Sequence, residues 1–209
     1  MTWPMRSRTA DPAALVQGWP RDYRAGYQHP TAQAQLDAAW GQAGPRLARW
    51  MRGETPEVPG WLFYGKPGHG KTSTALALVL AAAREGFTAR FSTAERLAAE
   101  RESTTFNARE GTTALGLLSD LLAPEVLLVD DIGTREYSPT VRALFLDMVR
   151  ERHSYGRLTI LTTNVPLNTA EGQAAFGRST DARLLSTYTG HAFNAGTWTA
   201  APVSLRTKP

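Results

Sequence analysis

The residues best suited to chemistry begin at Gly65, in a glycine-rich segment. Residues 65–72 read GKPGHGKT and fit the pattern G-x-x-x-x-G-K-[ST]. Glycines let the backbone curl so that successive N–H groups point at phosphate oxygens, and a helix that begins there adds its dipole. We expect Lys71 to reach the β- and γ-phosphates of a nucleotide and the Thr72 hydroxyl to coordinate Mg²⁺.

The expected nucleotide-binding residues form one run between an apolar strand and an apolar helix. A glycine-rich turn without a ligand is the alternative for a bare motif match, and this flanking pattern favours a phosphate loop. His69 takes a variable position of the pattern and is interpreted as a loop-filling residue. The run comprises Gly65, Lys66, Pro67, Gly68, His69, Gly70, Lys71, Thr72 and Ser73.

A pair of carboxylates, Asp130 and Asp131, follows the apolar residues 126–129. Ligands of α/β sheets bind at the carboxyl ends of the strands, where this run delivers the pair. We expect Asp130 to hold Mg²⁺ through water and Asp131 to polarise an attacking water. The alternative, a pair that caps the next turn, is disfavoured because the pair follows a phosphate loop.

Two further polar residues complete the candidate site. Asn164 follows the predicted strand 158–162, in the segment LTTN (161–164) that ends it, where a neutral amide could orient the attacking water or touch the γ-phosphate. A turn favoured by Pro166 is the alternative for Asn164. Arg183 could stabilise charge on the γ-phosphate from a neighbouring subunit, although its spacing alone favours an ordinary arginine on a helix surface.

Strands and helices are predicted to alternate along the chain. The strands are apolar on both faces, which indicates a parallel sheet covered by helices on both sides, an α/β fold. Gly86 stands where a glycine that ends a helix is expected. Predicted strands are 61–64, 87–92, 126–129, 158–162 and about 191–194; predicted helices are 31–52 (broken near Gly44 and Pro45), 71–84, 94–102, 112–122, 139–153 and 180–188.

Composition excludes several classes of protein. The chain has 209 residues, 42% hydrophobic and 20% charged, which is ordinary globular usage. It has no cysteine, so disulfides, thiol catalysis and cysteine-ligated metals are excluded. The apolar stretch 75–83 is too short to span a bilayer, which needs about 20 residues. We therefore expect a cytoplasmic protein without membrane contact, and the net charge of +4 is compatible with nucleic-acid binding.

In order, these motifs resemble those of the AAA+ ATPases, within them the group of DnaC-like helicase loaders and IstB-like transposition ATPases. The resemblance covers about residues 20–199. It rests on the segments WLFYGKPGHGKT (61–72), LLVDDIG (127–133), ERHSYGRLTILTTN (151–164) and DARLLS (181–186), with PRDYR (20–24) before the first helix. A single domain over 21–199 is expected, with a flexible arm at 1–20 and a tail at 200–209.

This resemblance implies a P-loop fold of AAA+ type with a parallel sheet. From the predicted strands we expect five strands in that sheet, and we expect no sizeable C-terminal lid domain. One strand is inserted between the phosphate-loop strand and the acidic-pair strand. ATP and Mg²⁺ are the implied ligands, with Asp130 as the magnesium residue, Asp131 as the catalytic carboxylate and Asn164 as a sensor of the γ-phosphate. The resemblance also favours Arg183 as an arginine finger.

The sequence departs from the family pattern at two places. Many members carry glutamate where this chain has Asp131, and the shorter side chain implies slow hydrolysis. Loaders usually end in a segment whose arginine senses nucleotide, whereas GTWTA (196–200) has no arginine. Either Arg206 replaces that arginine or the sensor is missing.

Several activities remain open at this stage. The first is a helicase-loader-like ATPase of DNA replication that assembles with its own copies or with a replicative helicase; the second is an ATPase that assists a transposase. A small-molecule phosphotransferase and a non-hydrolysing adaptor are further alternatives. Related ATPases contact single-stranded DNA near residues 94–113, and here Arg96, Arg101, Phe106 and Arg109 would suit that contact, although interleaved glutamates equally favour a solvated helix.

Overall fold

A computed structural model describes residues 15, 17, 19, 44–54, 60–106, 113–165, 169–176 and 189–193. Several expectations lie outside these residues: Arg183 and its helix 180–188, the segment 196–200, Arg206, Arg109 and the tail. The expected domain boundaries therefore stay predictions. None of the described helices combines the length and apolarity needed to cross a bilayer.

The sheet has five parallel strands in the order β2-β3-β4-β1-β5, as expected. Strand β4 lies between β1 and β3, which confirms the expected insertion between the phosphate-loop strand and the acidic-pair strand. The strands are β1 (Gly60–Gly65), β2 (Ala89–Thr93), β3 (Val126–Asp130), β4 (Leu158–Thr163) and β5 (Thr189–Phe193).

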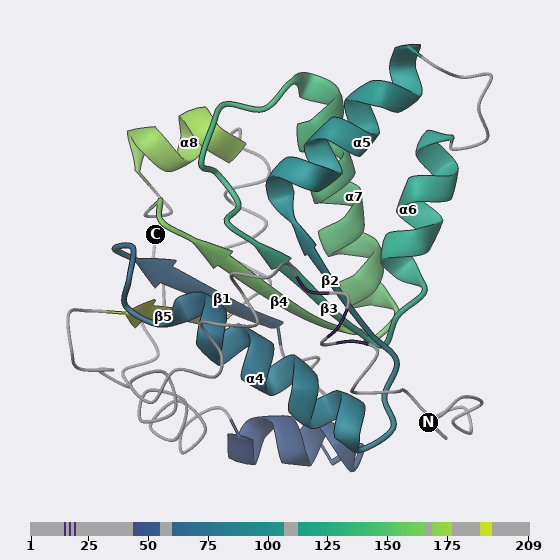
Figure 1. The fold of residues 1–209 in the computed structure, drawn as a ribbon, viewed down its shortest axis with the longest axis vertical. Coiled ribbons are helices and arrows are strands. Elements are labelled where there is room, and N and C mark those ends of the chain that lie inside the picture. Colours follow the sequence, from purple (N-terminus) through teal and green to yellow (C-terminus); the bar gives the residue numbers. More distant parts are fainter. Residues whose placement is uncertain are drawn as a thin grey trace, which may run out of the picture.

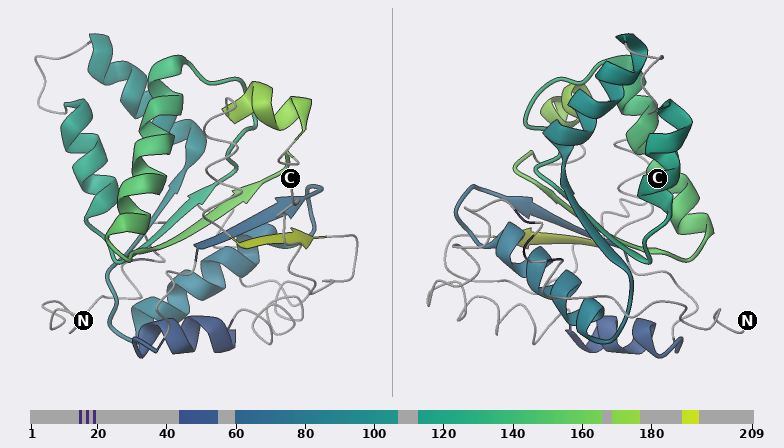
Figure 2. Two further views of the ribbon diagram at one scale, coloured as in Figure 1. Left: turned by 180° about the vertical axis from the view of Figure 1, so that it is seen from behind. Right: turned by 45° about the vertical axis from the view of Figure 1, so that its right-hand side comes forward.

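Helices cover both faces of this sheet (Figure 1). Helices α5, α6 and α7 lie on one face, and α4 with the unlabelled helix 44–51 lies on the other, as the views in Figure 2 also show. The labelled helices are α4 (Lys71–Arg84), α5 (Ala94–Phe106), α6 (Ala114–Leu122), α7 (Pro139–Ser154) and α8 (Ala170–Phe176).

Alternating strand residues divide the core into two clusters. Leu127 and Val129 of β3 pack with α5, α6 and α7, whereas Val126 and Leu128 pack with α4 and helix 44–51. The inward face predicted for α7 is confirmed, since its members are all buried: Val141, Leu144, Phe145, Met148 and Val149. A strand buried on both faces fixes its own position tightly, because any shift would expose apolar side chains.

Some boundaries differ from the predicted ones for local reasons. Strand β2 begins at Ala89 rather than residue 87, because the N–H of Phe87 bonds back to the carbonyl of Ala82 and belongs to the end of α4. Gly86, with φ of 86°, makes that turn in the left-handed region, as predicted. Helix α6 begins later than expected because the Thr113 hydroxyl accepts a hydrogen bond from Gly116 N and caps it.

Two features were not predicted. The short helix α8 follows Thr169, whose hydroxyl accepts from Gly172 N; its seven residues carry little periodicity from which to recognise it. Trp19, expected in a loose arm, is only 2% exposed and its ring lies 6.4 Å from that of Phe91. At this residue the N-terminal region is therefore packed against the core.

A buried arginine, Arg152 of α7, organises the amino ends of β3 and β4. It is fully buried, and its guanidinium donates to Thr159 Oγ1 at 2.8 Å and to several backbone carbonyls. These carbonyl acceptors are Leu121 and Pro124 at 2.8 Å, Glu125 at 3.3 Å and Leu158 at 2.6 Å. One side chain thus joins α7 to β4 and to the turn that enters β3.

Candidate nucleotide-binding and catalytic site

The glycine-rich loop connects β1 to α4 at the carboxyl edge of the sheet. Gly68 and Gly70 have φ of 78° and 88°, a backbone region that other residues rarely adopt. A Cβ added at Gly68 would meet nothing within 4 Å, so the backbone angle rather than space requires glycine there. His69 contributes Nδ1 to a 2.9 Å contact with Lys66 O, in keeping with a role inside the loop.

Lys71, the first residue of α4, lies over this loop. Its ammonium donates to Gly65 O at 2.8 Å and to Lys66 O at 2.9 Å, and only 5% of the residue is exposed. Burial lowers the pKa of Lys71, while the nearby carboxylates of Asp131 and Asp130 act in the opposite direction. The loop therefore holds a desolvated cation, which is a strong partner for phosphate.

Asp130 ends β3 and contacts the start of α4. It is 1% exposed, and its Oδ1 accepts a hydrogen bond from Thr72 Oγ1 at 2.8 Å. A second hydroxyl, Thr162 Oγ1 of β4, donates to the same carboxylate oxygen. Thr72 of the glycine-rich loop and Asp130 of the acidic pair are far apart in sequence. They are in contact here, as the motifs predicted.

Asp131 turns sharply out of the sheet. Its φ of 57° lies in the left-handed region, which a non-glycine residue adopts only when its surroundings stabilise it. The backbone N–H of Asp131 donates to Thr162 Oγ1 at 2.9 Å, and Asn164 Nδ2 donates to Asp131 Oδ1 at 3.2 Å. The turn brings the Asp131 carboxylate beside the expected sensor amide.

The glycine-rich loop, the start of α4, Asp131 and Asn164 border one open pocket of about 270 Å³. One wall is the loop and the first turn of α4, contributed by Pro67, Gly68, Gly70, Lys71, Thr72 and Ser73, and the other is Asp131 and Asn164. Lys71 is the cationic side chain among these lining residues. A pocket with a cation on one wall and a carboxylate with an amide on the other can hold a phosphate beside a water-activating group.

The predicted residues are brought together to different degrees. Lys71, Thr72, Asp131 and Asn164 share the pocket, and Asp130 lies directly behind Thr72. Gly65, Lys66 and His69 belong to the loop that borders the pocket rather than to its lining. Arg183 lies outside the described residues. The binding and catalytic roles of all these residues stay predictions.

The donor set suits Mg²⁺. Thr72 lines the pocket and offers a hydroxyl, and the carboxylate of Asp130 lies directly behind it, at 2.8 Å from that hydroxyl. Magnesium prefers oxygen ligands and is commonly bound by one or two such groups together with substrate phosphates. The residues present therefore fit this cation.

Two residues beside the site had not been assigned a role from the sequence. Thr162 contacts both members of the acidic pair, and Tyr137 accepts a hydrogen bond from Gly133 N at 3.0 Å. Burial raises the pKa of Tyr137, so its phenol remains neutral over an ordinary pH range. The sequence shows Thr162 only as one of three threonines in the strand LTILTT, and it does not single out the one that contacts the acidic pair.

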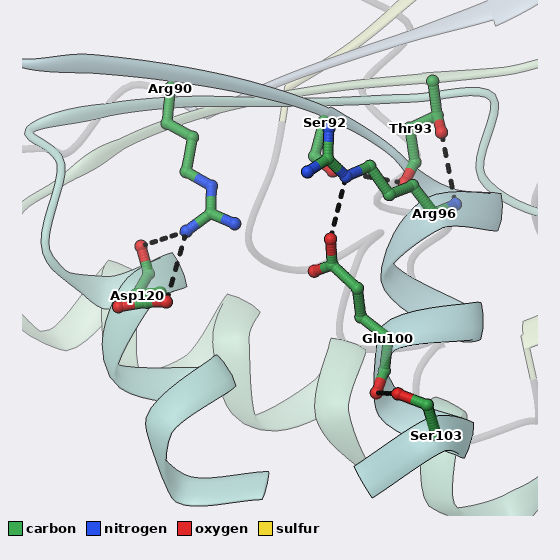
Figure 3. A network of polar contacts seen from close by, with 7 residues as sticks. All are labelled: Arg90, Ser92, Thr93, Arg96, Glu100, Ser103 and Asp120. Atoms are coloured by element: carbon green, nitrogen blue, oxygen red, sulfur yellow. Dashed lines mark hydrogen bonds and ion pairs between the residues drawn. The ribbon is translucent and has the colours of Figure 1, made fainter. Parts of the chain in front are cut away.

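The charged segment that includes α5 was expected to be either a DNA contact or a solvated helix, and Figure 3 shows polar contacts of α5 and of the neighbouring β2 and α6. Arg96 is largely exposed and donates to Glu100 at 2.8 Å, while Arg90 donates to Asp120 O at 3.0 Å. Arg101 donates to Thr104 Oγ1 at 3.1 Å. These arginines are thus held by groups of the protein itself, which neither requires nor prevents a contact with nucleic acid.

Comparison with known proteins places this site in a family. Residues 60–188, more than half of the chain, match the family model described as IstB-like ATP binding protein. This span begins at β1 and includes the phosphate loop, the acidic pair and Asn164. A comparison with curated protein sequences finds no match.

Solved structures share the fold at low sequence identity. The DnaC helicase loader has a TM-score of 0.62 and 22% identity, over 84% of this chain and 100% of that one. DnaI has a TM-score of 0.64 and 17% identity, over 85% of this chain and 95% of that one. Domain III of the replication initiation protein DnaA from Thermotoga maritima has a TM-score of 0.58 and 13% identity, over 88% and 68% of the two chains.

Proposed function

The chain belongs to the family of IstB-like ATP-binding proteins, and on this premise we propose that it binds and hydrolyses ATP as an AAA+ ATPase. The observation that carries the proposal is the shared pocket, in which Lys71 and Thr72 face Asp131 and Asn164. A phosphate held by the loop would lie beside a carboxylate that can accept a proton from water. Such an arrangement suits hydrolysis better than transfer to a second substrate.

Each residue has a role that follows from its contacts. The loop N–H groups and Lys71 bind the phosphates, and Thr72 with Asp130 would hold Mg²⁺. The cation neutralises charge on the phosphate oxygens when it is bound. Asp131 accepts the proton of the attacking water, and Asn164, which already donates to Asp131, fixes the orientation of that carboxylate.

Release of phosphate from ATP without any added acceptor tests the proposed reaction. The purified chain, incubated with ATP and Mg²⁺, is expected to release phosphate slowly, because the short side chain of Asp131 holds its carboxylate further from the water than glutamate would. Phosphate release only with an added acceptor would indicate a phosphotransferase instead. Tight ATP binding without any release would indicate a nucleotide-dependent adaptor.

For the cellular task we propose a helicase-loader-like role in DNA replication, in an assembly with further copies of the chain or with a replicative helicase. The fold shared with the DnaC helicase loader over its whole length supports this role. In such an assembly Arg183 would reach the site of a neighbouring copy and stabilise charge on the γ-phosphate.

A second candidate is an ATPase that assists a transposase, and the IstB-like family match favours it. Affinity capture from the native host, with and without a non-hydrolysable ATP analogue, separates the two candidates. Capture of a replicative helicase that depends on the analogue supports the loader role. Capture of a transposase supports the second role.

Single-stranded DNA contact is proposed for the surface around α5. Arg96 supplies an exposed guanidinium there, held 2.8 Å from Glu100. Fluorescence anisotropy of a labelled oligonucleotide at low salt is expected to rise when the ATP-bound assembly is added, and Arg96→Ala should weaken that binding. Absence of binding with and without an ATP analogue would contradict this part of the proposal.

A further inference from the structure

We propose that Thr162 is a positioning residue that couples magnesium binding to the geometry of the acidic pair. This inference rests on the proposed function, because it concerns the same ATP site. It assigns to one buried hydroxyl of β4 the task of setting both Asp130 and Asp131. The residue does not line the pocket and acts only through these two neighbours.

The hydroxyl of Thr162 is used in both directions. A threonine hydroxyl has one hydrogen to donate and lone pairs that accept. Here the hydrogen is donated to Asp130 Oδ1, and a lone pair accepts the backbone N–H of Asp131 at 2.9 Å. The residue is fully buried, so water is not at hand to replace either bond. Among small side chains, only those of threonine and serine carry a hydroxyl that can make both contacts.

The first contact orients the carboxylate that faces the magnesium site. Asp130 Oδ1 accepts from Thr162 and also from Thr72 Oγ1 at 2.8 Å. Because Thr72 directs its single hydrogen to Asp130, the lone pairs of the Thr72 oxygen remain directed elsewhere and are the part of the hydroxyl that a cation can take. Thr162 therefore holds Asp130 in the rotamer that presents Thr72 correctly to Mg²⁺.

The second contact stabilises an unfavourable backbone. Asp131 has φ of 57°, a conformation that residues with side chains adopt only under constraint. The bond from Asp131 N to Thr162 fixes the start of this turn, and the Asp131 carboxylate then meets Asn164 Nδ2 at 3.2 Å. One hydroxyl thus sets the direction of two carboxylates with different roles.

Removal of the Thr162 hydroxyl should weaken the binding of magnesium more than the binding of the nucleotide. Loss of a group that orients a metal ligand typically lowers metal affinity by about 10- to 100-fold. Lys71 and the loop N–H groups do not contact Thr162 and keep their hold on the phosphates. Valine has the shape of threonine and suits a strand, so Thr162→Val removes the two hydrogen bonds with little change in packing.

Binding of a fluorescent ATP analogue, measured in EDTA and over a Mg²⁺ titration, tests the inference on the full chain. Thr162→Val is expected to bind the analogue like wild type in EDTA and to need about 10- to 100-fold more Mg²⁺ for the tighter, magnesium-dependent binding. Thr162→Ser keeps the hydroxyl and should restore the wild-type requirement. Thr159→Val removes a buried hydroxyl from the amino end of β4 and should leave the requirement unchanged, which controls for loss of stability.

The outcomes separate this inference from the proposed function. A wild-type chain that binds no ATP analogue, with or without Mg²⁺, overturns the proposed function and the inference with it. Normal ATP binding with an unchanged Mg²⁺ requirement in Thr162→Val overturns the inference alone. The inference is also overturned if serine fails to restore the requirement, or if Thr159→Val raises it as much as Thr162→Val does.

Discussion

The two ends of β3 and β4 are each held by a buried polar residue, and the two arrangements differ in kind. At the amino end, Arg152 donates to backbone carbonyls and to Thr159, groups that the fold itself supplies. At the carboxyl end, Thr162 contacts Asp130 and Asp131; Asp131 itself lines the pocket, and Asp130 lies behind the pocket-lining Thr72. The same strands therefore carry a closed polar cluster at one end and an open one at the other.

The difference is between buried polar groups whose partners all belong to the protein and polar groups that border a pocket. The guanidinium of Arg152 is surrounded by acceptors of the chain, so its hydrogen bonds stabilise the fold without involving a ligand. At the carboxyl end a desolvated ammonium, Lys71, and a left-handed aspartate, Asp131, are held in costly states. Such costs are typical of sites prepared for a ligand that compensates them.

The largest expected effect is that of Lys71→Ala at the open end. Hydrogen bonds to a charged group contribute about 1.5–3 kcal/mol each, so the loss of the two contacts that we expect Lys71 to make with the β- and γ-phosphates lowers affinity by more than about 100-fold. ATP binding should fall below detection in a fluorescence titration. Arg84→Ala, at the other end of the same helix, should bind like wild type, and equal losses in both variants would contradict the assignment.

Asp131→Asn is expected to stop turnover and spare binding. The amide keeps the size of the carboxylate but cannot accept a proton, and loss of a general base typically lowers the rate by about 100- to 10,000-fold. Phosphate release and nucleotide affinity should be measured on the same preparation. Asp120→Asn, an exposed change on α6, serves as the matched control. Normal hydrolysis by Asp131→Asn would show that the catalytic carboxylate lies elsewhere.

At the closed end, Arg152→Lys is expected to reduce stability without changing ATP binding. Lysine has fewer donors than arginine in a different geometry, and each buried carbonyl left without a donor costs about 1–3 kcal/mol. We expect urea unfolding to show a loss of about 2–4 kcal/mol. Arg150→Lys, exposed on the same helix, should cost almost nothing. A stable Arg152→Lys variant that no longer binds ATP would break the distinction between the two ends.

The smallest effect is expected for Thr113→Ala, which sets the scale of a single exposed hydrogen bond. The Thr113 hydroxyl accepts from Gly116 N at 3.0 Å and caps α6. Loss of such a cap typically costs about 1 kcal/mol. Urea unfolding should show this loss for alanine and much less for Thr113→Ser. A loss of unfolding free energy as large as that of Arg152→Lys would mean that the buried hydrogen bonds of Arg152 stabilise the fold no more than one exposed helix cap does.

The sequence predicted the open end far better than the closed one. The spacing of glycines, Lys71 and Thr72 repeats a pattern whose chemistry is known, and an apolar strand that ends in Asp130 and Asp131 is typical of a ligand site at the edge of a parallel sheet. Parallel pairing then brings these segments to one edge. Fold class and the residues of the pocket could therefore be inferred from residue types and their order along the chain, whereas the strand order came from the family resemblance.

The contacts of Arg152 and Thr162 could not be inferred in the same way. An arginine on a helix is usually exposed, and only the packing of α7 against the start of β4 buries this one. The role of Thr162 depends on its register with β3, which the sequence alone leaves open by one residue. Helix α8 was missed because seven residues carry too little periodicity.

One measurement tests most directly whether the two ends differ as described: the stabilisation that a magnesium-bound, non-hydrolysable ATP analogue gives to wild type, Lys71→Ala and Arg152→Lys in urea unfolding. A ligand at about 100 times its Kd stabilises the folded state by about 2.7 kcal/mol. We expect that increment in wild type and, on a lower baseline, in Arg152→Lys, with none in Lys71→Ala. An equal increment in Lys71→Ala, or none in wild type, would contradict the assignment of the open end as the ATP site.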